Sequence, residues 1–196
     1  MLLTRSVTLV LLLAACSSST NASPAPTTGG PALDRRPTGV AASTVLDCSD
    51  PIATLTRPDA GYQVVDDTIA LQTARSSRTY LDTSPTGATS SSSPLFAKTG
   101  LLVRTGATAV VTVPPRRRGR VAVEWGNTTR RSPTTSLHVP RCPGSRGWIA
   151  FPGGYFVRRP ECVPIDVRVG NRTTRVHVGV GTGCRGQRPP PAVPTP

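Results

Sequence analysis

The sequence is poor in aromatic residues, in charged residues and in lysine. Aromatic side chains make up 4% of the 196 residues and charged ones 17%, and both fractions are low for a globular domain. Of the 23 basic residues only Lys98 is a lysine. Proline and glycine are abundant instead, with 21 and 18 residues. We therefore expect a loop-rich fold whose packed core is smaller than the chain.

The sequence also lacks any segment with apolar residues at helical spacing that is long enough to predict a helix. Short runs rich in β-branched residues, several alternating with period two and separated by Pro and Gly turns, occupy 61–71, 101–113, 120–125, 135–139, 148–157, 163–169 and 174–180. A Thr-Gly turn at 105–106 breaks the second run. The pattern predicts an all-β fold over residues 45–186, a single antiparallel β-sandwich of the immunoglobulin-like kind. The polar segment 72–94 predicts a flexible loop inside this domain.

Half of the eight aromatic residues gather in one short stretch. Trp148, Phe151, Tyr155 and Phe156 flank Gly153-Gly154, a pair that suits a two-residue hairpin turn. We expect these rings in the core, because a domain with few aromatics needs them there. An exposed rim that stacks on sugars is the alternative.

A hydrophobic run long enough to span a membrane is missing too. Residues 7–15 are apolar apart from Thr8 and follow Arg5, which is typical of a signal peptide and too short for the roughly 20 residues of a membrane span. The run ends in Leu13-Ala14-Ala15-Cys16, which resembles the lipobox of bacterial lipoproteins. The resemblance implies a diacylglyceryl group on Cys16, cleavage that removes residues 1–15, and anchoring at the outer face of the cytoplasmic membrane. The alternative is a secreted protein, but no better cleavage site follows.

Both flanks of the expected domain have the composition of disordered segments. Residues 16–44 are rich in Ser, Thr, Pro and Gly and predict a linker between the lipid and the domain. As a flexible coil this linker would have a mean reach of about 30 Å. Residues 187–196 predict a disordered Pro-rich tail.

With Cys16 assigned to lipid, the sequence has four further cysteines, Cys48, Cys142, Cys162 and Cys184. An even number in an exported domain predicts two disulfides, and the sequence permits three pairings. We favour Cys142–Cys162 and Cys48–Cys184, which would close the aromatic hairpin and tie the first strand to the last. A metal site is disfavoured because the chain has no CxxC pair and only two isolated histidines.

The sequence offers little for catalysis, so we expect neither an enzyme nor a cofactor. No serine lies in a G-x-S-x-G motif, and His138 and His177 both lie in predicted strands. The adjacent Asp66 and Asp67 supply too few ligands for a cation. A cryptic hydrolase would need a cleft that joins one histidine to a serine.

The positive charge is concentrated in the second half of the chain. Residues 101–196 carry sixteen basic and three acidic side chains, whereas residues 17–100 carry six and seven. The run PPRRRGR at 114–120 predicts a hairpin tip with projecting arginines, for which a plain solvated turn is the simpler interpretation. Glu161 is expected to pair with the neighbouring arginines. The arginines that we expect to contact an anionic surface are Arg116, Arg117, Arg118, Arg120, Arg158 and Arg159.

The expected location decides which anions these arginines meet. Outside the cell membrane the abundant anions are phospholipid headgroups and wall polymers, so we expect no nucleic-acid partner. The string WIAFPGGYFVRRPECVPIDVRVG resembles segments of small uncharacterised exported proteins of actinobacteria, which implies no particular activity. The sequence therefore predicts a membrane-anchored lipoprotein that acts as a non-catalytic binding module for anionic envelope components. The alternative is a protein-interaction subunit of an envelope complex or transporter.

Overall fold

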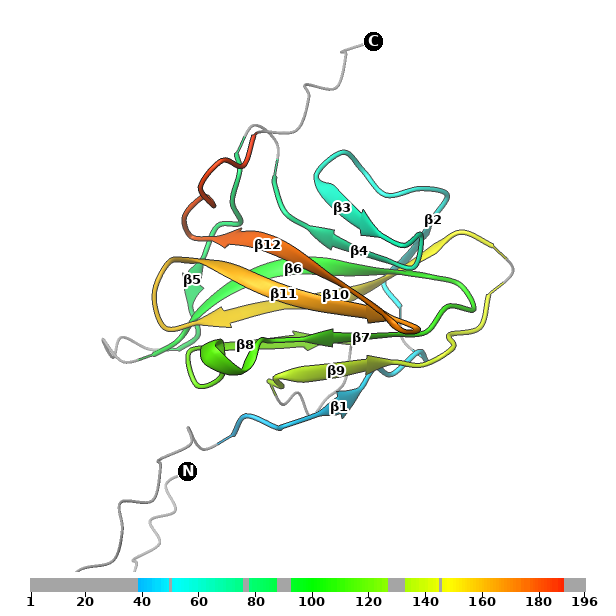
Figure 1. Cartoon of the computed structure of the whole chain (residues 1–196), viewed down its shortest axis with the longest axis horizontal. Helices are drawn as coiled ribbons and strands as arrows, with labels where there is room; N and C mark the ends of the chain where they lie inside the picture. The colour runs from blue at the N-terminus through cyan, green and yellow to red at the C-terminus, as the bar shows by residue number, and fades with distance from the viewer. Residues whose placement is uncertain are drawn as a thin grey trace, which may run out of the picture. The chain divides into compact units, whose positions relative to one another are not determined.

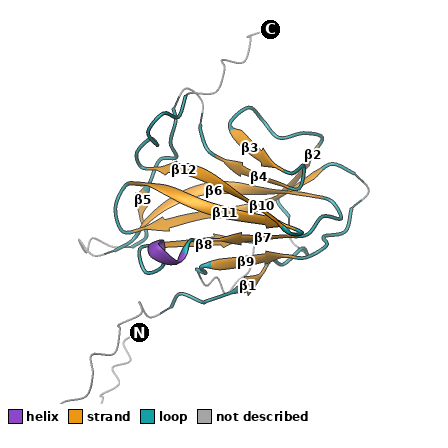
Figure 2. Ribbon diagram, viewed as in Figure 1, coloured by secondary structure: helices purple, strands orange, loops and turns teal. Residues whose placement is uncertain are grey.

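The described part of the chain is built almost entirely of β-strands. The computed structural model describes residues 39–49, 51–75, 78–87, 93–126, 133–144 and 146–188. Within these ranges the only helix is the 3-10 turn η1 (Pro115–Arg117), as Figure 2 shows. No helix in these ranges is long and apolar enough to cross a membrane. The all-β prediction is confirmed.

The smaller sheet has five strands in the order β1-β9-β7-β11-β12 (Figure 1). Its strands are β1 (Thr44–Val45), β9 (Ser136–Val139), β7 (Ala109–Thr112), β11 (Glu161–Val169) and β12 (Arg172–Val180). The hairpin β11–β12 turns at Gly170, whose φ of 58° is one that glycine adopts at little cost. The pair β1–β9 is parallel, so the sandwich is not wholly antiparallel as predicted.

The larger sheet has seven strands, with β6 and β10 at its centre. Its path is β2-β10-β6-β4-β3, with β8 also on β10 and β5 also on β6. The strands are β2 (Ala53–Leu55), β3 (Tyr62–Val65), β4 (Ile69–Gln72), β5 (Ser84–Pro85), β6 (Leu95–Arg104), β8 (Val121–Trp125) and β10 (Trp148–Val157). Because β6 and β10 are ten residues long, each pairs with two shorter strands in succession along one edge.

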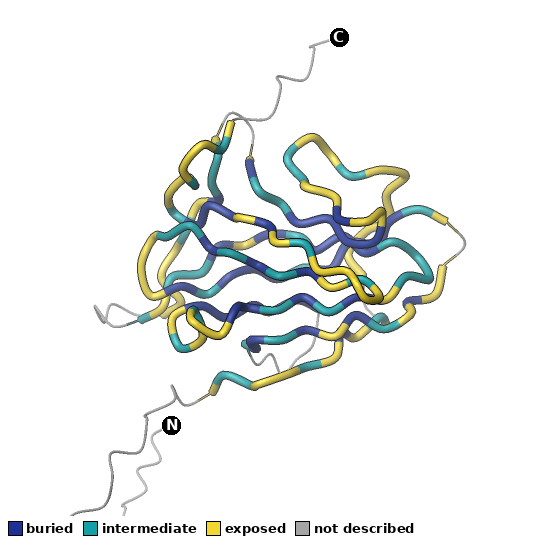
Figure 3. Tube along the Cα trace, viewed as in Figure 1, coloured by how far each residue is buried: buried dark blue, intermediate teal, exposed yellow. Residues whose placement is uncertain are grey.

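The two sheets share one apolar core, which makes the fold sandwich-like. Alternate side chains of both sheets point into it, and burial alternates along the strands in Figure 3. Phe151 and Tyr155 of β10 are fully buried there, and Trp125 of β8 contacts Tyr155 edge to face at 5.2 Å. Burial raises the pKa of the Tyr155 hydroxyl. Phe151 and Tyr155 are therefore core residues, as expected.

The other two aromatics of the cluster lie on the outer face of the larger sheet. Trp148 packs there in a small second cluster with Ala70, Leu102 and Ala150. Phe156 is half-buried, and its ring lies 4.7 Å from that of Phe96. Trp148 is only 2% exposed, so the expected burial is confirmed for three of the four rings. Phe156 alone is half-buried, because β10 runs straight through Gly153-Gly154 and period two sends every second side chain outward.

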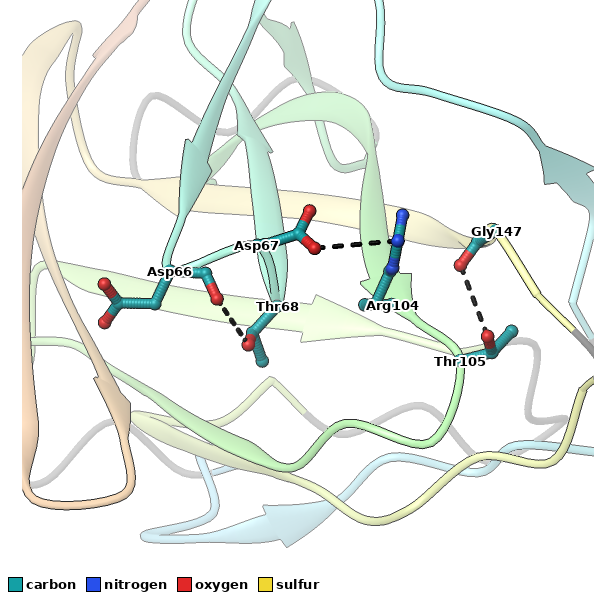
Figure 4. A network of polar contacts seen from close by, with 6 residues as sticks. All are labelled: Asp66, Asp67, Thr68, Arg104, Thr105 and Gly147. Atoms are coloured by element: carbon teal, nitrogen blue, oxygen red, sulfur yellow. Dashed lines mark hydrogen bonds and ion pairs between the residues drawn. The ribbon is translucent and has the colours of Figure 1, made fainter.

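The expected hairpin turn at Gly153-Gly154 does not form, and the turn lies elsewhere. The run 61–71, predicted as one strand, is instead the hairpin β3–β4. Asp66 and Asp67 form its tip with φ values of 47° and 49°, and the Thr68 amide donates to the Val65 carbonyl, as in a type I′ turn. Figure 4 shows this turn with the Thr68 hydroxyl donating to the Asp66 carbonyl.

The structure contains two disulfides, as predicted, but the favoured pairing of the four cysteines is wrong. The bonds are Cys48–Cys142 and Cys162–Cys184. Parallel pairing of β1 with β9 lets the two chains run on side by side, which brings Cys48 to Cys142. In β11, Cys162 lies opposite Gly179, and the chain turns back at Gly181 to bring Cys184 close.

The limits of the folded part differ slightly from those predicted. Ala41 already bridges to Thr134, and β1 starts at Thr44, so the sheet begins before residue 45. In the predicted loop 72–94, β5 pairs with β6 and the buried Leu81 bridges to Val180. The predicted signal peptide, Cys16, most of the linker, the serines at 90–92 and tail residues 189–196 lie outside the described residues.

Candidate anion-binding site

The arginine-rich run 114–120 connects the two sheets. It leads from β7 in the smaller sheet to β8 in the larger one, so it is a crossover and not the hairpin tip that was predicted. Pro114 and Pro115 end the ladder of β7, since proline has no amide to donate, and η1 follows. Gly119 has a φ of 86°, which a side chain would disfavour, and sets the path into β8.

One arginine of the crossover is used inside the fold. The Arg117 guanidinium lies 2.6 Å from the Glu161 carboxylate, and the two side chains are 34% and 10% exposed. Glu161 therefore pairs with Arg117 and not with its neighbours Arg158 and Arg159 as expected. The Arg118 Nε lies 3.4 Å from the Val113 carbonyl, to which it donates. We assign these two arginines to holding the crossover against the sheets.

Two other arginines face each other across neighbouring strands. Val157 of β10 pairs with Val121 of β8, and the Arg158 amide then donates to the Arg120 carbonyl at 3.2 Å. By the period of two, both side chains project on the outer face of the larger sheet, and both residues are exposed. No carboxylate of the described residues pairs with either one. Like charges placed directly opposite each other destabilise a sheet.

A cavity of about 360 Å³ opens beside this arginine pair, and we name it the Phe156 pocket. Apolar side chains form most of its wall. The lining residues are Val40, Pro94, Gly119, Arg120, Val121, Ala122, Pro133, Phe156 and Arg158. The site therefore joins two guanidinium groups, which have no carboxylate partner among the described residues, to an apolar cavity.

The register of the larger sheet orders the residues around the pocket in rows. Ala122, Phe156 and Phe96 form one row across β8, β10 and β6, next to the row of Arg120 and Arg158. The next row on the other side holds Glu124, Gly154 and Lys98. Glu124 is 8% exposed, whereas Lys98 is exposed. The apolar row thus lies between a row with two arginines and a row that holds one carboxylate and one lysine.

The remaining arginines named by the sequence lie close by but outside the pocket. Arg116 in η1 and Arg159 after β10 are both exposed. The pairing of Arg117 with Glu161 and of Arg158 with Arg120 brings the segments 114–120 and 158–161 together. Five of the six arginines are exposed, whereas Arg117 is partly buried against Glu161, and their contact with an anionic surface stays a prediction.

Three arginines elsewhere in the positive half are paired with a carboxylate. Arg175 forms two hydrogen bonds to Asp166 at 2.7 and 2.9 Å, which raise the pKa of its guanidinium. Arg172 and Arg104 lie 3.5 and 3.6 Å from Asp66 and Asp67, and the second contact is drawn in Figure 4. Arg104 also lies over the Trp148 ring at 5.6 Å. Unlike these three arginines, Arg120 and Arg158 have no carboxylate partner in the described residues, and they differ from exposed arginines such as Arg141 and Arg146 in lying directly opposite each other.

The structure does not assemble a catalytic or metal centre from the other candidates. His138 on β9 and His177 on β12 are separated by two strands of the smaller sheet. Ser136 lies two residues from His138, but no hydrogen bond between them is present in the described part of the chain. Within the same ranges no three His, Cys, Asp or Glu side chains gather closely enough to hold a metal.

Sequence reasoning missed the apolar half of the site. Period two in RVAVEW and in YFVRR places Ala122 with Arg120 and Phe156 with Arg158 on one face, which was a usable signal. The walls from Val40, Pro94 and Pro133 carry no such signal, since they come from distant segments.

A search against protein-family models found no match, and comparisons with curated proteins and with solved structures gave none either.

Proposed function

We propose that this protein is a membrane-anchored extracytoplasmic lipoprotein that binds the anionic surface of the membrane without catalysis. The observation that carries the proposal is the exposed Arg120–Arg158 pair, which has no carboxylate partner in the described residues. Arginine guanidinium groups match phosphate oxygens in geometry and stay charged at all physiological pH values. An anionic surface would offset the electrostatic repulsion between the guanidinium groups of Arg120 and Arg158.

The anchor is the second part of the proposal and depends on the motif Leu13-Ala14-Ala15-Cys16. Two acyl chains on Cys16 would hold the chain stably at the membrane, which a single chain does not. Val40, near the start of the described chain, lines the Phe156 pocket. The linker would therefore join the domain beside the arginine pair, within about 30 Å of the lipid. That geometry favours the arginine end as the face nearest the membrane.

We also propose that the domain is an immunoglobulin-like sandwich that serves as a rigid scaffold for a binding surface. Two sheets around one core support it. Its disulfides differ from the immunoglobulin pattern, since neither joins a strand of one sheet to a strand of the other. Because Arg120 and Arg158 project on the outer face of the larger sheet, we propose that binding occurs there and not on loops at the end of the sandwich.

The test is binding to vesicles by the mature chain from residue 16 with Cys16→Ser, which has no lipid of its own and retains every core residue. We expect it to bind vesicles rich in phosphatidylglycerol and not vesicles of phosphatidylcholine. Each cation near such a surface contributes about 1 kcal/mol, so Arg120→Gln/Arg158→Gln should weaken binding about 30-fold. Salt should weaken wild-type binding, because the Debye length falls from about 10 Å at 0.1 M to about 3 Å at 1 M.

The matched control is Arg141→Gln/Arg146→Gln, which removes the same charge from exposed arginines that precede β10, whereas Arg158 follows it. We expect this variant to lose much less affinity than the pocket variant. Equal losses in the two variants would show a diffuse charge effect, and no salt-sensitive vesicle binding by the wild type would refute the proposed function.

A further inference from the structure

We propose that the Phe156 pocket binds one anionic lipid molecule, with its phosphate between Arg120 and Arg158 and its acyl chain against Phe156 and Ala122. This deepens the proposed function, because it names the ligand class of the same site. It also goes beyond the proposed function, because electrostatic attraction of the arginines to a membrane surface requires no cavity. The ligand is defined by its chemistry, a phosphate monoester or diester attached to an aliphatic chain.

The arginine pair calls for an anion that contacts both guanidinium groups at once. Adjacent antiparallel strands hold opposite Cβ atoms only about 4.5–5.5 Å apart, so both forks can reach one phosphate. The Arg117 guanidinium contacts Oε2 of Glu161, and the other oxygen of that carboxylate is buried, so Glu161 does not pair with the exposed Arg120 or Arg158. A bound phosphate therefore supplies the countercharge that the fold omits.

The wall of the pocket selects an apolar tail. Six of the nine lining residues have side chains made only of carbon and hydrogen: Val40, Pro94, Val121, Ala122, Pro133 and Phe156. A free inorganic anion or a sugar-phosphate polymer gains nothing from such a wall, whereas each buried methylene of an acyl chain contributes about 0.8 kcal/mol. A volume of about 360 Å³ falls within the usual range for small-ligand pockets, which is about 300–1,000 Å³.

The order of the rows gives the lipid one orientation. The exposed arginine row would hold the headgroup, and the adjacent row of Ala122, Phe156 and Phe96 would receive the chain. Beyond this apolar row lies the row of Glu124, Gly154 and Lys98, which carries one negative and one positive charge, whereas the row of Arg120 and Arg158 carries two positive charges. The phosphate therefore stays at the end of the pocket where Arg120 and Arg158 lie.

The experiment measures binding of monomeric lipid in solution, which separates the pocket from the membrane surface. The mature chain from residue 16 with Cys16→Ser is titrated calorimetrically with a short-chain lysophosphatidic acid below its micelle concentration. We expect one lipid bound per chain, and at least tenfold weaker binding of the matching lysophosphatidylcholine. Glycerol phosphate, which has the headgroup without the chain, should bind at least tenfold more weakly as well.

Two pairs of variants locate the ligand. Arg120→Gln/Arg158→Gln should lose at least tenfold in affinity, whereas Arg116→Gln/Arg159→Gln, at the same end but outside the pocket, should lose less than threefold. Val40→Glu places a carboxylate in the pocket wall and should also abolish binding. Its control is Val45→Glu on the smaller sheet, at a residue that is 64% exposed. Thermal unfolding of each variant confirms that it is folded.

Each outcome separates this inference from the proposed function. Vesicle binding without binding of monomeric lysolipid would overturn the pocket proposal and leave the surface proposal intact. Equal affinity for lysophosphatidic acid and glycerol phosphate would remove any role for the chain, and equal losses in the two double-arginine variants would remove the pocket as the location. Loss of both vesicle and lysolipid binding in the wild type would refute both proposals.

Discussion

Removal of the Cys48–Cys142 disulfide by Cys48→Ala/Cys142→Ala is expected to lower the free energy of unfolding by about 4.5 kcal/mol. The bond links residues 94 positions apart, and a cross-link over so long a loop removes much of the entropy of the unfolded chain. Domains of this size are stable by about 5–15 kcal/mol, so the variant should be close to its folding threshold. Urea unfolding followed by tryptophan fluorescence measures the change.

The second disulfide provides the comparison. Cys162–Cys184 spans only 22 positions, and Cys162→Ala/Cys184→Ala should cost about 3.5 kcal/mol by the same reasoning. The short loop encloses the β11–β12 hairpin, whose ladder of hydrogen bonds remains without the cross-link. If loss of the short loop proved more costly than loss of the long one, chain entropy would not explain how these bonds stabilise the domain.

Gly153→Ala is expected to destabilise the protein by more than about 4 kcal/mol, although Ala usually suits a strand better than Gly. A Cβ at residue 153 would lie 1.9 Å from the Glu124 carbonyl oxygen and 2.7 Å from the Trp125 Cα. Both are backbone atoms of β8, so no side-chain rotation relieves the clash. The variant should detach β8 from β10 or fail to fold, as measured by circular dichroism and urea unfolding.

Gly87→Ala is the matched control for this clash. No atom lies within 4 Å of the position that its Cβ would take, and its φ is outside the left-handed region. The same change there should leave stability within about 1 kcal/mol of the wild type, with a small gain from a stiffer unfolded chain. A Gly153→Ala variant as stable as Gly87→Ala would contradict the close contact of β8 with β10.

The strands could be predicted from sequence wherever local pattern alone decides. The alternation in Val163, Ile165 and Val167 is a local property, and it located β11 correctly. At 61–71 and at Gly153-Gly154 the same reasoning failed in opposite ways. Two aspartates formed a tight turn despite positive φ values, and two glycines that suggested a turn lie in a continuous strand where neighbouring backbones come too close for a Cβ.

Pairing between distant segments was beyond prediction from one sequence. The disulfides depend on the parallel contact of β1 with β9, and nothing in the two residues of β1 indicates that partner. The candidate site shows the same division. Arg120 and Arg158 were both expected at an anionic surface, but only the register of β8 against β10 makes them a pair. The pocket wall needs Val40 and Pro133 as well, which are 93 positions apart in the chain.

The proposed anchor at Cys16 decides whether the domain is held at a membrane, and mass spectrometry of the N-terminus tests it most directly. Full-length protein is produced in a bacterium that processes lipoproteins, extracted from the membrane fraction and digested with trypsin. We predict a peptide that begins at Cys16, carries a diacylglyceryl group and ends at Arg35. An unmodified peptide from Ser6 to Arg35 with a free Cys16 thiol would contradict the account.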